Sequence, residues 1–144
     1  MSVRVDFYIL AQANENAGWQ FACKLAEKAY RHKQRMYVYC ADQTAAHRFD
    51  ELLWTFHDIS FVPHLLQGET AKYPPAINIG YSEPQGNYPI ILNLSHDIPA
   101  FYSRSKRVME IVFGDETTRA STRERFKQYR ADSCDMHTHQ MDNY

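Results

Sequence analysis

Glycine is scarce in this chain, and its absence from one turn argues against a common class of ligand. The five glycines stand at positions 18, 68, 80, 86 and 114, with no Gly-x-Gly-x-x-Gly or Gly-Lys-Ser motif. The turn after the first predicted strand, residues 11–18, holds only Gly18 and carries Glu15 where a phosphate group would bind. Nucleotides normally bind at a glycine-rich turn, where bare backbone amides approach the phosphates. The sequence therefore predicts no nucleotide-binding loop and no cofactor.

Cysteines and long apolar runs are also few. Cys23, Cys40 and Cys134 are an odd number, lie far apart and form no Cys-x-x-Cys pair, which indicates a reducing compartment and argues against a structural zinc site. No run of 18 apolar residues occurs, and the opening Met-Ser-Val-Arg-Val-Asp contains no apolar signal core. We therefore expect neither export nor contact with a membrane, and the predicted location is the cytoplasm.

Residues suited to catalysis or metal binding form no convincing constellation. Cys134, His137 and His139 fall within six residues and could hold zinc, but they lie in a polar C-terminal segment with no second ligand cluster. The other histidines are scattered along the chain. One alternative stays open, a small α/β enzyme that uses His64, or His96 beside Asp97. The prediction is a protein without catalytic residues or metal ligands.

What the chain does contain is an alternation of β-rich and helical segments, in a length of 144 residues that suits one domain. Apolar runs predict strands at residues 3–10, 36–40, 76–79, 90–94 and 108–113. Helical spacing and capping residues predict helices at 17–32 after Asn16, at 43–54 after Asp42 and from Asp115 to 131, with a short helix within 95–102.

This order of elements indicates the fold class. Parallel strands need crossover helices, so the alternation predicts a three-layer, Rossmann-like α/β domain with a mostly parallel sheet flanked by helices. We expect residues 1–131 to form this single domain. Residues 132–144 are predicted to be a polar, flexible tail.

Between Asp50 and Gly68 aromatic residues are concentrated at the end of a predicted helix. Trp54 and Phe56 lie in or just after the helix, and Phe61 opens a Phe-Val-Pro-His turn that cannot continue it. Aromatic side chains dominate the energetics of protein interfaces because they bury a large area at little cost in rotamer entropy. The tract is typical of either a docking surface or a domain core, and its pattern alone does not separate the two.

The predicted C-terminal helix has a cationic face. Arg119, Arg123, Phe126, Lys127 and Arg130 fall within about 100° of arc when they are placed on a helix. An arginine guanidinium can hold a carboxylate or a phosphate with two parallel hydrogen bonds. The face therefore suits three roles: a solvated surface, direct binding of single-stranded DNA, or recognition of an acidic peptide with an apolar residue beside Phe126. The net charge of -1 argues against nucleic acid.

Four blocks of sequence resemble the chi subunits of bacterial DNA polymerase III holoenzyme. They occur in order across residues 3–131: Phe-Tyr-Ile-Leu at 7–10, Arg-Phe-Asp-Glu-Leu-Leu-Trp at 48–54, Ser-Phe-Val-Pro-His at 60–64 with Gly-Glu at 68–69, and Arg-Glu-Arg-Phe-Lys-Gln-Tyr-Arg at 123–130. The chain departs from the family in residues 67–75 and after 131.

The resemblance implies a non-catalytic accessory subunit of a DNA-directed DNA polymerase (nucleotidyltransferase) complex, with a Rossmann-like fold that binds no nucleotide. It implies two partners. One is the psi subunit, which would tether the chain to the clamp loader. The other is the acidic, phenylalanine-terminated C-terminal tail of single-stranded-DNA-binding protein, which would link the chain to single-stranded DNA indirectly. Carried over by position, the psi-binding residues are Trp54, Phe61 and Pro63. The tail-binding residues are Val112, Arg119, Arg123, Phe126 and Lys127.

Overall fold

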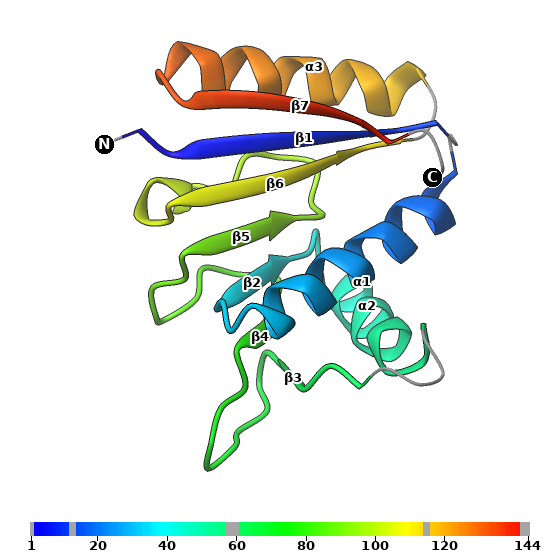
Figure 1. Cartoon of the computed structure of the whole chain (residues 1–144), viewed down its shortest axis with the longest axis vertical. Coiled ribbons are helices and arrows are strands. Elements are labelled where there is room, and N and C mark those ends of the chain that lie inside the picture. Colours follow the sequence, from blue (N-terminus) through cyan, green and yellow to red (C-terminus); the bar gives the residue numbers. More distant parts are fainter. Residues whose placement is uncertain (1, 12–13, 57–60, 114–115, 142–144) are drawn as a thin grey trace.

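The computed structural model describes residues 2–11, 14–56, 61–113 and 116–141, which form one sheet with helices on both faces (Figure 1). The strands are β1 (Arg4–Leu10), β2 (Met36–Tyr39), β3 (His64–Leu66), β4 (Ile77–Gly80), β5 (Ile90–Asn93), β6 (Arg107–Val112) and β7 (Asp135–Met141). The helices are α1 (Glu15–Arg31), α2 (Gln43–Thr55) and α3 (Glu116–Ala131), with a 3₁₀ helix at Tyr102–Arg104.

Every described strand pairing is parallel, and the strand order is β3-β4-β2-β5-β6-β1-β7. Alternate residues of β1 point to opposite faces of the sheet. Val5 and Phe7 pack in one core cluster with Tyr129 of α3, whereas Tyr8 and Leu10 pack in the larger cluster with α1 and α2. The predicted three-layer, Rossmann-like α/β fold is confirmed, and its sheet is parallel in every described pair.

The capping residues explain where the first two helices begin. Asn14, not the predicted Asn16, caps α1, because its side chain accepts a hydrogen bond of 2.7 Å from the backbone N–H of Ala17. Asp42 caps α2 as predicted, accepting a bond of 2.8 Å from Ala45. The predicted cap of α3, Asp115, lies outside the described residues.

Two strands at the edges of the sheet contradict the sequence prediction. Residues 135–141 were expected in a flexible tail, but they form β7, whose residues pair with β1 along its whole length. An edge strand needs little burial, so its sequence, Asp-Met-His-Thr-His-Gln-Met, carries no strong apolar signal. At the opposite edge, His64–Leu66 form β3 at the end of the predicted turn at residues 61–64, where no strand was expected; this strand of three residues is too short to give a pattern.

The expected short helix within residues 95–102 is also absent, because a side chain takes over the hydrogen bonds of that turn. Asn93, at the end of β5, accepts a bond of 2.6 Å from the Ser95 hydroxyl and donates one of 3.0 Å to the Asp97 carbonyl. Only Tyr102–Arg104 close into a 3₁₀ turn.

The first turn of α1 packs tightly against the end of β6 at Gly18. The ring of Phe113 lies so near Gly18 that a Cβ there would come within 2.7 Å of a ring carbon. Because glycine has no side chain, α1 can approach the end of β6 closely. Gly18 therefore has a role in helix-to-sheet packing.

Candidate functional site

A pair of exposed aromatic rings lies at the end of α2. Trp54 is 49% exposed and Phe61 is 60% exposed. Their ring centroids are 5.0 Å apart with the planes tilted by 34°, so the two rings make one apolar surface. Pro63, half-buried, follows two residues after Phe61. We call Trp54, Phe61 and Pro63 the aromatic patch. Contiguous apolar surface of this kind marks sites of interaction on soluble proteins.

The other apolar residues of the tract belong to the core. Phe49 and Leu53 are fully buried, and Leu52 and Phe56 pack against the same cluster from partly buried positions. Trp54 extends from the outer side of α2. The structure thus separates core from surface within a tract whose sequence fitted either one.

His64 packs against the buried side of Trp54 in the aromatic patch. Its side chain is fully buried, and its ring lies 4.3 Å from the Trp54 ring, centroid to centroid. Nδ1 donates a hydrogen bond of 2.6 Å to the Val62 carbonyl, and Nε2 lies 3.2 Å from a carboxylate oxygen of Asp50 without hydrogen-bond geometry. Burial raises the pKa of Asp50. A ring enclosed in this way cannot reach a substrate in solution, so the structure offers no support for His64 as a catalytic base.

Helix α3 carries the second predicted site. Phe126 is half-buried, with its ring centroid 5.2 Å from that of Phe7, and it packs against the core cluster that contains Val112. Arg123 and Lys127 are exposed, whereas Arg119 is partly buried. Thr122, Arg125 and Tyr129 form the inner, buried side of the helix. Phe126 therefore lies where the buried side of α3 meets its cationic side. We call Val112, Arg119, Arg123, Phe126 and Lys127 the α3 surface.

The exposed cations of the α3 surface already have carboxylate partners within the helix. Arg123 forms an ion pair with Glu116, in the first turn of α3. Lys127 lies 3.4 Å from Glu124. These pairs are exposed, so each stabilises the fold only slightly and can exchange for an external carboxylate.

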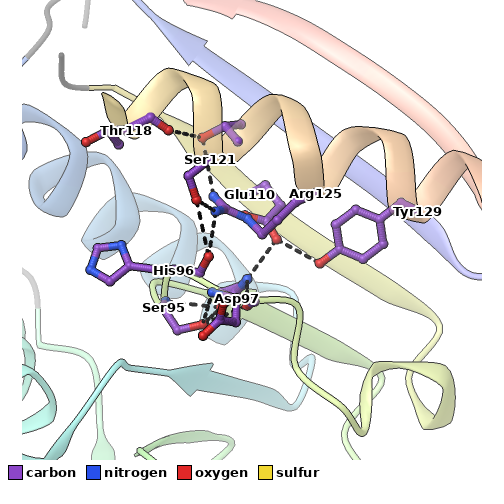
Figure 2. Close-up of polar contacts among 10 residues, drawn as sticks. Ser95, His96, Asp97, Glu110, Thr118, Ser121, Arg125 and Tyr129 are labelled. Atoms are coloured by element: carbon purple, nitrogen blue, oxygen red, sulfur yellow. Dashed lines mark hydrogen bonds and ion pairs between the residues drawn. The ribbon is translucent and has the colours of Figure 1, made fainter. Parts of the chain in front are cut away.

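Arg125 differs from the other cations of α3 because it is buried (Figure 2). Its Nε donates to Glu110 of β6 at 3.2 Å, and its Nη1 donates to the His96 carbonyl at 2.9 Å. Tyr129 also donates to Glu110, at 2.7 Å. Burial raises the pKa of Glu110, although Arg125 and these hydrogen bonds favour its charged form. The network attaches α3 to the sheet and leaves Arg125 a structural role.

His96 and Asp97 enter the same network through their backbone. The carbonyl of Asp97 accepts bonds from Asn93 and Ser95, and that of His96 accepts a bond from Arg125. Figure 2 shows the His96 imidazole pointing away from the Glu110 and Arg125 side chains. Among the described residues the structure shows no hydrogen bond between the His96 and Asp97 side chains, so it gives the enzyme alternative no catalytic pair.

The candidate zinc ligands near the C-terminus do not assemble. Cys134 packs in the α3 cluster, with its thiol 3.8 Å from the Tyr102 hydroxyl. His139 lies across the sheet, where its ring stacks on Tyr8 at 4.9 Å. The thiol and this imidazole therefore lie on opposite faces of the sheet, and the described residues hold no cluster of three or more metal-ligating side chains. The described part of the chain likewise has no helix long and apolar enough to cross a bilayer.

A buried charge cluster on β1 was missed by the sequence reasoning, although an aspartate inside a predicted apolar strand could have signalled it. Asp6 is fully buried and accepts hydrogen bonds from Arg4 at 3.0 Å, from Arg107 at 2.6 Å and from His139 at 2.7 Å. Burial alone would raise the pKa of Asp6, but these hydrogen bonds outweigh it and lower the pKa to about 2.

The lowered pKa of Asp6 predicts an acid-dependent loss of stability. Because the folded-state pKa is below the unfolded one, the stabilisation is complete above about pH 4 and is lost as the pH falls toward 2. A shift from 3.8 to about 2 corresponds to roughly 2 kcal/mol. We expect Asp6→Asn to lower the free energy of unfolding by about that amount at pH 7 and to flatten its dependence on pH below 4. Urea titrations across that range measure both effects, and an unchanged slope would contradict the assignment.

The structure defines a Rossmann-like α/β protein with an exposed aromatic patch beside β3 and a cationic face on α3. Comparison with known proteins identifies the family: the model of the family described as DNA polymerase III chi subunit, HolC, matches residues 1–137. The chain therefore belongs to the chi subunit family, accessory subunits of DNA polymerase III in replication.

Three relatives named DNA polymerase III subunit chi illustrate the similarity. The chain is 37% identical over 139 residues to that of Pseudomonas aeruginosa, covering 96% of each chain. It is 29% identical over 140 residues to that of Haemophilus influenzae, covering 96% of this chain and 97% of the relative. The match to the Escherichia coli subunit is 28% over 121 residues, covering 83% and 82%.

Proposed function

We propose that this protein is a non-catalytic subunit that bridges the clamp loader of DNA polymerase III holoenzyme to single-stranded-DNA-binding protein in the cytoplasm. The aromatic patch binds psi, and the α3 surface binds the acidic C-terminal tail of the DNA-binding protein. One observation carries the proposal: the two surfaces differ in chemistry and lie toward opposite ends of the sheet, one beside the edge strand β3 and the other on α3, which packs over β6, β1 and β7 (Figure 1). One chain can therefore hold both partners at once.

The aromatic patch fits a protein partner that buries apolar side chains. A groove of about 700 Å³ adjoins Trp54 and extends between α1 and α2 toward Arg48 and Glu51. These two residues, with Glu15, Asn16 and Thr55, put charged and polar groups beside the apolar side chains of Trp19, Leu52 and Trp54. Specific interfaces usually combine apolar and polar groups in this way. A segment of psi that covers Trp54 and Phe61 can continue into this groove.

The α3 surface fits an acidic peptide that ends in phenylalanine. Arg123 holds the terminal carboxylate, and Phe126 and Val112 contact the last side chain. Arg119 and Lys127 attract the aspartates that precede it. The ion pair between Glu116 and Arg123 supports this arrangement. It shows that the Arg123 guanidinium is placed to bind a carboxylate, and the Glu116 carboxylate holds the position proposed for that of the peptide.

Two variants of the same ion pair test the tail site in opposite directions. Arg123→Ala removes a charged hydrogen bond and should weaken binding of a labelled acidic, phenylalanine-terminated peptide by about 10- to 100-fold. Glu116→Gln removes the internal competitor and should strengthen binding by about two- to threefold. Fluorescence anisotropy at low and physiological salt measures both, and the affinity of the wild type should fall with salt.

Arg130→Ala is the matched control, because Arg130 is exposed on the same helix but lies outside the proposed pocket. It should change the affinity by less than about twofold. Equal binding by the wild type and Arg123→Ala would remove the proposal. Direct binding of an oligothymidylate, lost in Arg123→Ala, would instead favour the single-stranded-DNA role of the cationic face.

A further inference from the structure

A groove of about 750 Å³ opens between α1 and the sheet, on the face opposite α3. It exists because α1 connects two strands that are not neighbours, since β5 and β6 lie between β1 and β2. Helix α1 therefore runs obliquely across the sheet (Figure 1). The amino-terminal ends of β1 and β6 line the groove with the last half of α1.

Positive charge surrounds this groove. The described residues that line it include five lysines and arginines and one histidine, and no aspartate or glutamate. The six side chains are Lys24 and Lys28 on α1, His32 at the C-cap of α1, and Arg4, Lys106 and Arg107 on the sheet side. The first three recur every fourth residue, so they follow one ridge at steps of about 6 Å. In a chain of net charge -1, this is a strong local concentration of one sign.

The floor between these walls is mainly aliphatic. Leu25 contributes from α1, Met109 from β6 and Met141 from β7. Tyr8 and Phe21 also line the groove, and they are 8% and 4% exposed, so little of either ring is available to a ligand. Leu25 and Met109 are similarly buried, at 7% and 5%, whereas Met141 is half-buried. The groove therefore has a narrow aliphatic floor, most open at Met141 and bordered by cations.

The two arginines of the sheet side are held in place before any ligand binds. Asp6 receives two parallel bonds of 3.0 Å from Arg4 and one of 2.6 Å from Arg107, which also donates to the Tyr8 hydroxyl at 2.9 Å. Both side chains remain partly exposed, at 45% and 33%. In the described part of the chain these bonds use Nε and Nη2 and leave the Nη1 groups for another acceptor. Such preorganisation lowers the entropic cost of binding a carboxylate.

We propose that this groove binds an acidic peptide segment of a partner protein in which one large aliphatic side chain lies between carboxylates. The carboxylates pair with the cations of α1 and of the sheet side, and the aliphatic side chain packs on the floor against Met141 and the small exposed parts of Leu25 and Met109. Single-stranded nucleic acid is the other polyanion that a cationic groove attracts, but proteins hold it by stacking its bases on exposed aromatic rings. The groove does not expose such rings.

This site is separate from both surfaces of the proposed function. Helix α3 packs on the opposite face of the sheet, and the aromatic patch adjoins β3 at the far edge. Occupation of the groove therefore leaves the tail site and the psi site open.

Charge reversal on both walls tests the groove. The probe is a fluorescein-labelled peptide with a leucine flanked on each side by aspartates, titrated against the full chain by fluorescence anisotropy. Lys28→Glu/Lys106→Glu, exposed positions on opposite walls, should weaken binding by at least about tenfold. Arg31→Glu/Lys72→Glu makes the same change of net charge at exposed positions outside the groove and should change binding by less than about twofold. Replacing the leucine of the peptide by serine should also weaken binding several-fold.

A methyl NMR experiment locates the bound leucine, because its entry should shift the Met109 and Met141 methyl resonances. Arg123→Ala should bind the peptide like the wild type, which separates this proposal from the tail site on α3. Equal weakening by both charge-reversal pairs would overturn the proposal, as would unshifted methionine signals. Displacement of the peptide by an oligothymidylate of equal charge would assign the groove to nucleic acid instead.

Discussion

Trp54→Ala will abolish co-purification of psi with this protein while leaving the fold intact. Tryptophan is the residue most often found at the energetic centre of an interface, and its truncation commonly costs about 2 to 4 kcal/mol of binding, or roughly 30- to 1,000-fold in affinity. Trp54 is half exposed and stacks with Phe61, so a partner that covers the pair buries both rings. Pull-down of co-expressed psi, followed by calorimetric titration, measures the loss.

Two matched variants separate docking from folding. Tyr73→Ala removes an aromatic ring that is 82% exposed on another loop and should leave psi binding unchanged. Leu53→Ala, one residue before Trp54 but fully buried, should cost about 2 to 5 kcal/mol of stability. If Trp54→Ala lowers the melting temperature as much as Leu53→Ala does, the ring is core. If it leaves the capture of psi unchanged, the aromatic patch is not the psi site.

Arg125→Met will be the most destabilising substitution on α3. It leaves Glu110 charged and enclosed without its cation, and breaking a buried pair in this way costs about 3 to 5 kcal/mol. The pKa of Glu110, already raised by burial, will rise further. The deficit should therefore shrink as the pH falls, because a protonated Glu110 needs no cation. Urea denaturation at several pH values measures this dependence.

The double variant Glu110→Gln/Arg125→Met is the control for this pair. Glutamine is neutral and can keep the hydrogen bonds from Tyr129 and Asn93, so the double variant should recover part of the stability that Arg125→Met loses. A double variant no more stable than Arg125→Met would mean that Arg125 acts through its contacts with His96 and Ser121 instead. Arg123→Met, an exposed change on the same helix, should cost less than about 1 kcal/mol.

The central elements could be predicted because their local signals agree with the fold. Met36–Tyr39 is a short apolar run suited to a parallel strand buried on both faces, and Asp42 caps the helix that follows it. The edge strands β3 and β7 could not be predicted in the same way. The residues of β7 are polar, and their strand conformation depends on pairing with β1, at a separation in sequence that no local pattern can show.

For the candidate sites too, the sequence predicted what depends on local spacing and missed what depends on packing between distant segments. The helical arc placed Arg123, Phe126 and Lys127 together and left out Arg125, which the structure buries against Glu110. The sequence could not separate Trp54 from Leu53, because both lie in one aromatic and aliphatic tract and only packing decides which side chain faces solvent. The cationic groove was missed altogether, since its walls come from segments near residues 4, 28 and 107.

The place of β1 in the sheet also affects how the protein is made. This first strand lies between β6 and β7, so its neighbours on both sides come from the end of the chain. On the ribosome, β1 has no partner until β6 has emerged and has only one until β7 has emerged, whereas β2, β4 and β5 can already pair. Folds that depend on such distant contacts form slowly, and an unpaired apolar strand is prone to aggregate in the interval. Pairing of β1 with β6 and β7 is therefore the step that completes this sheet.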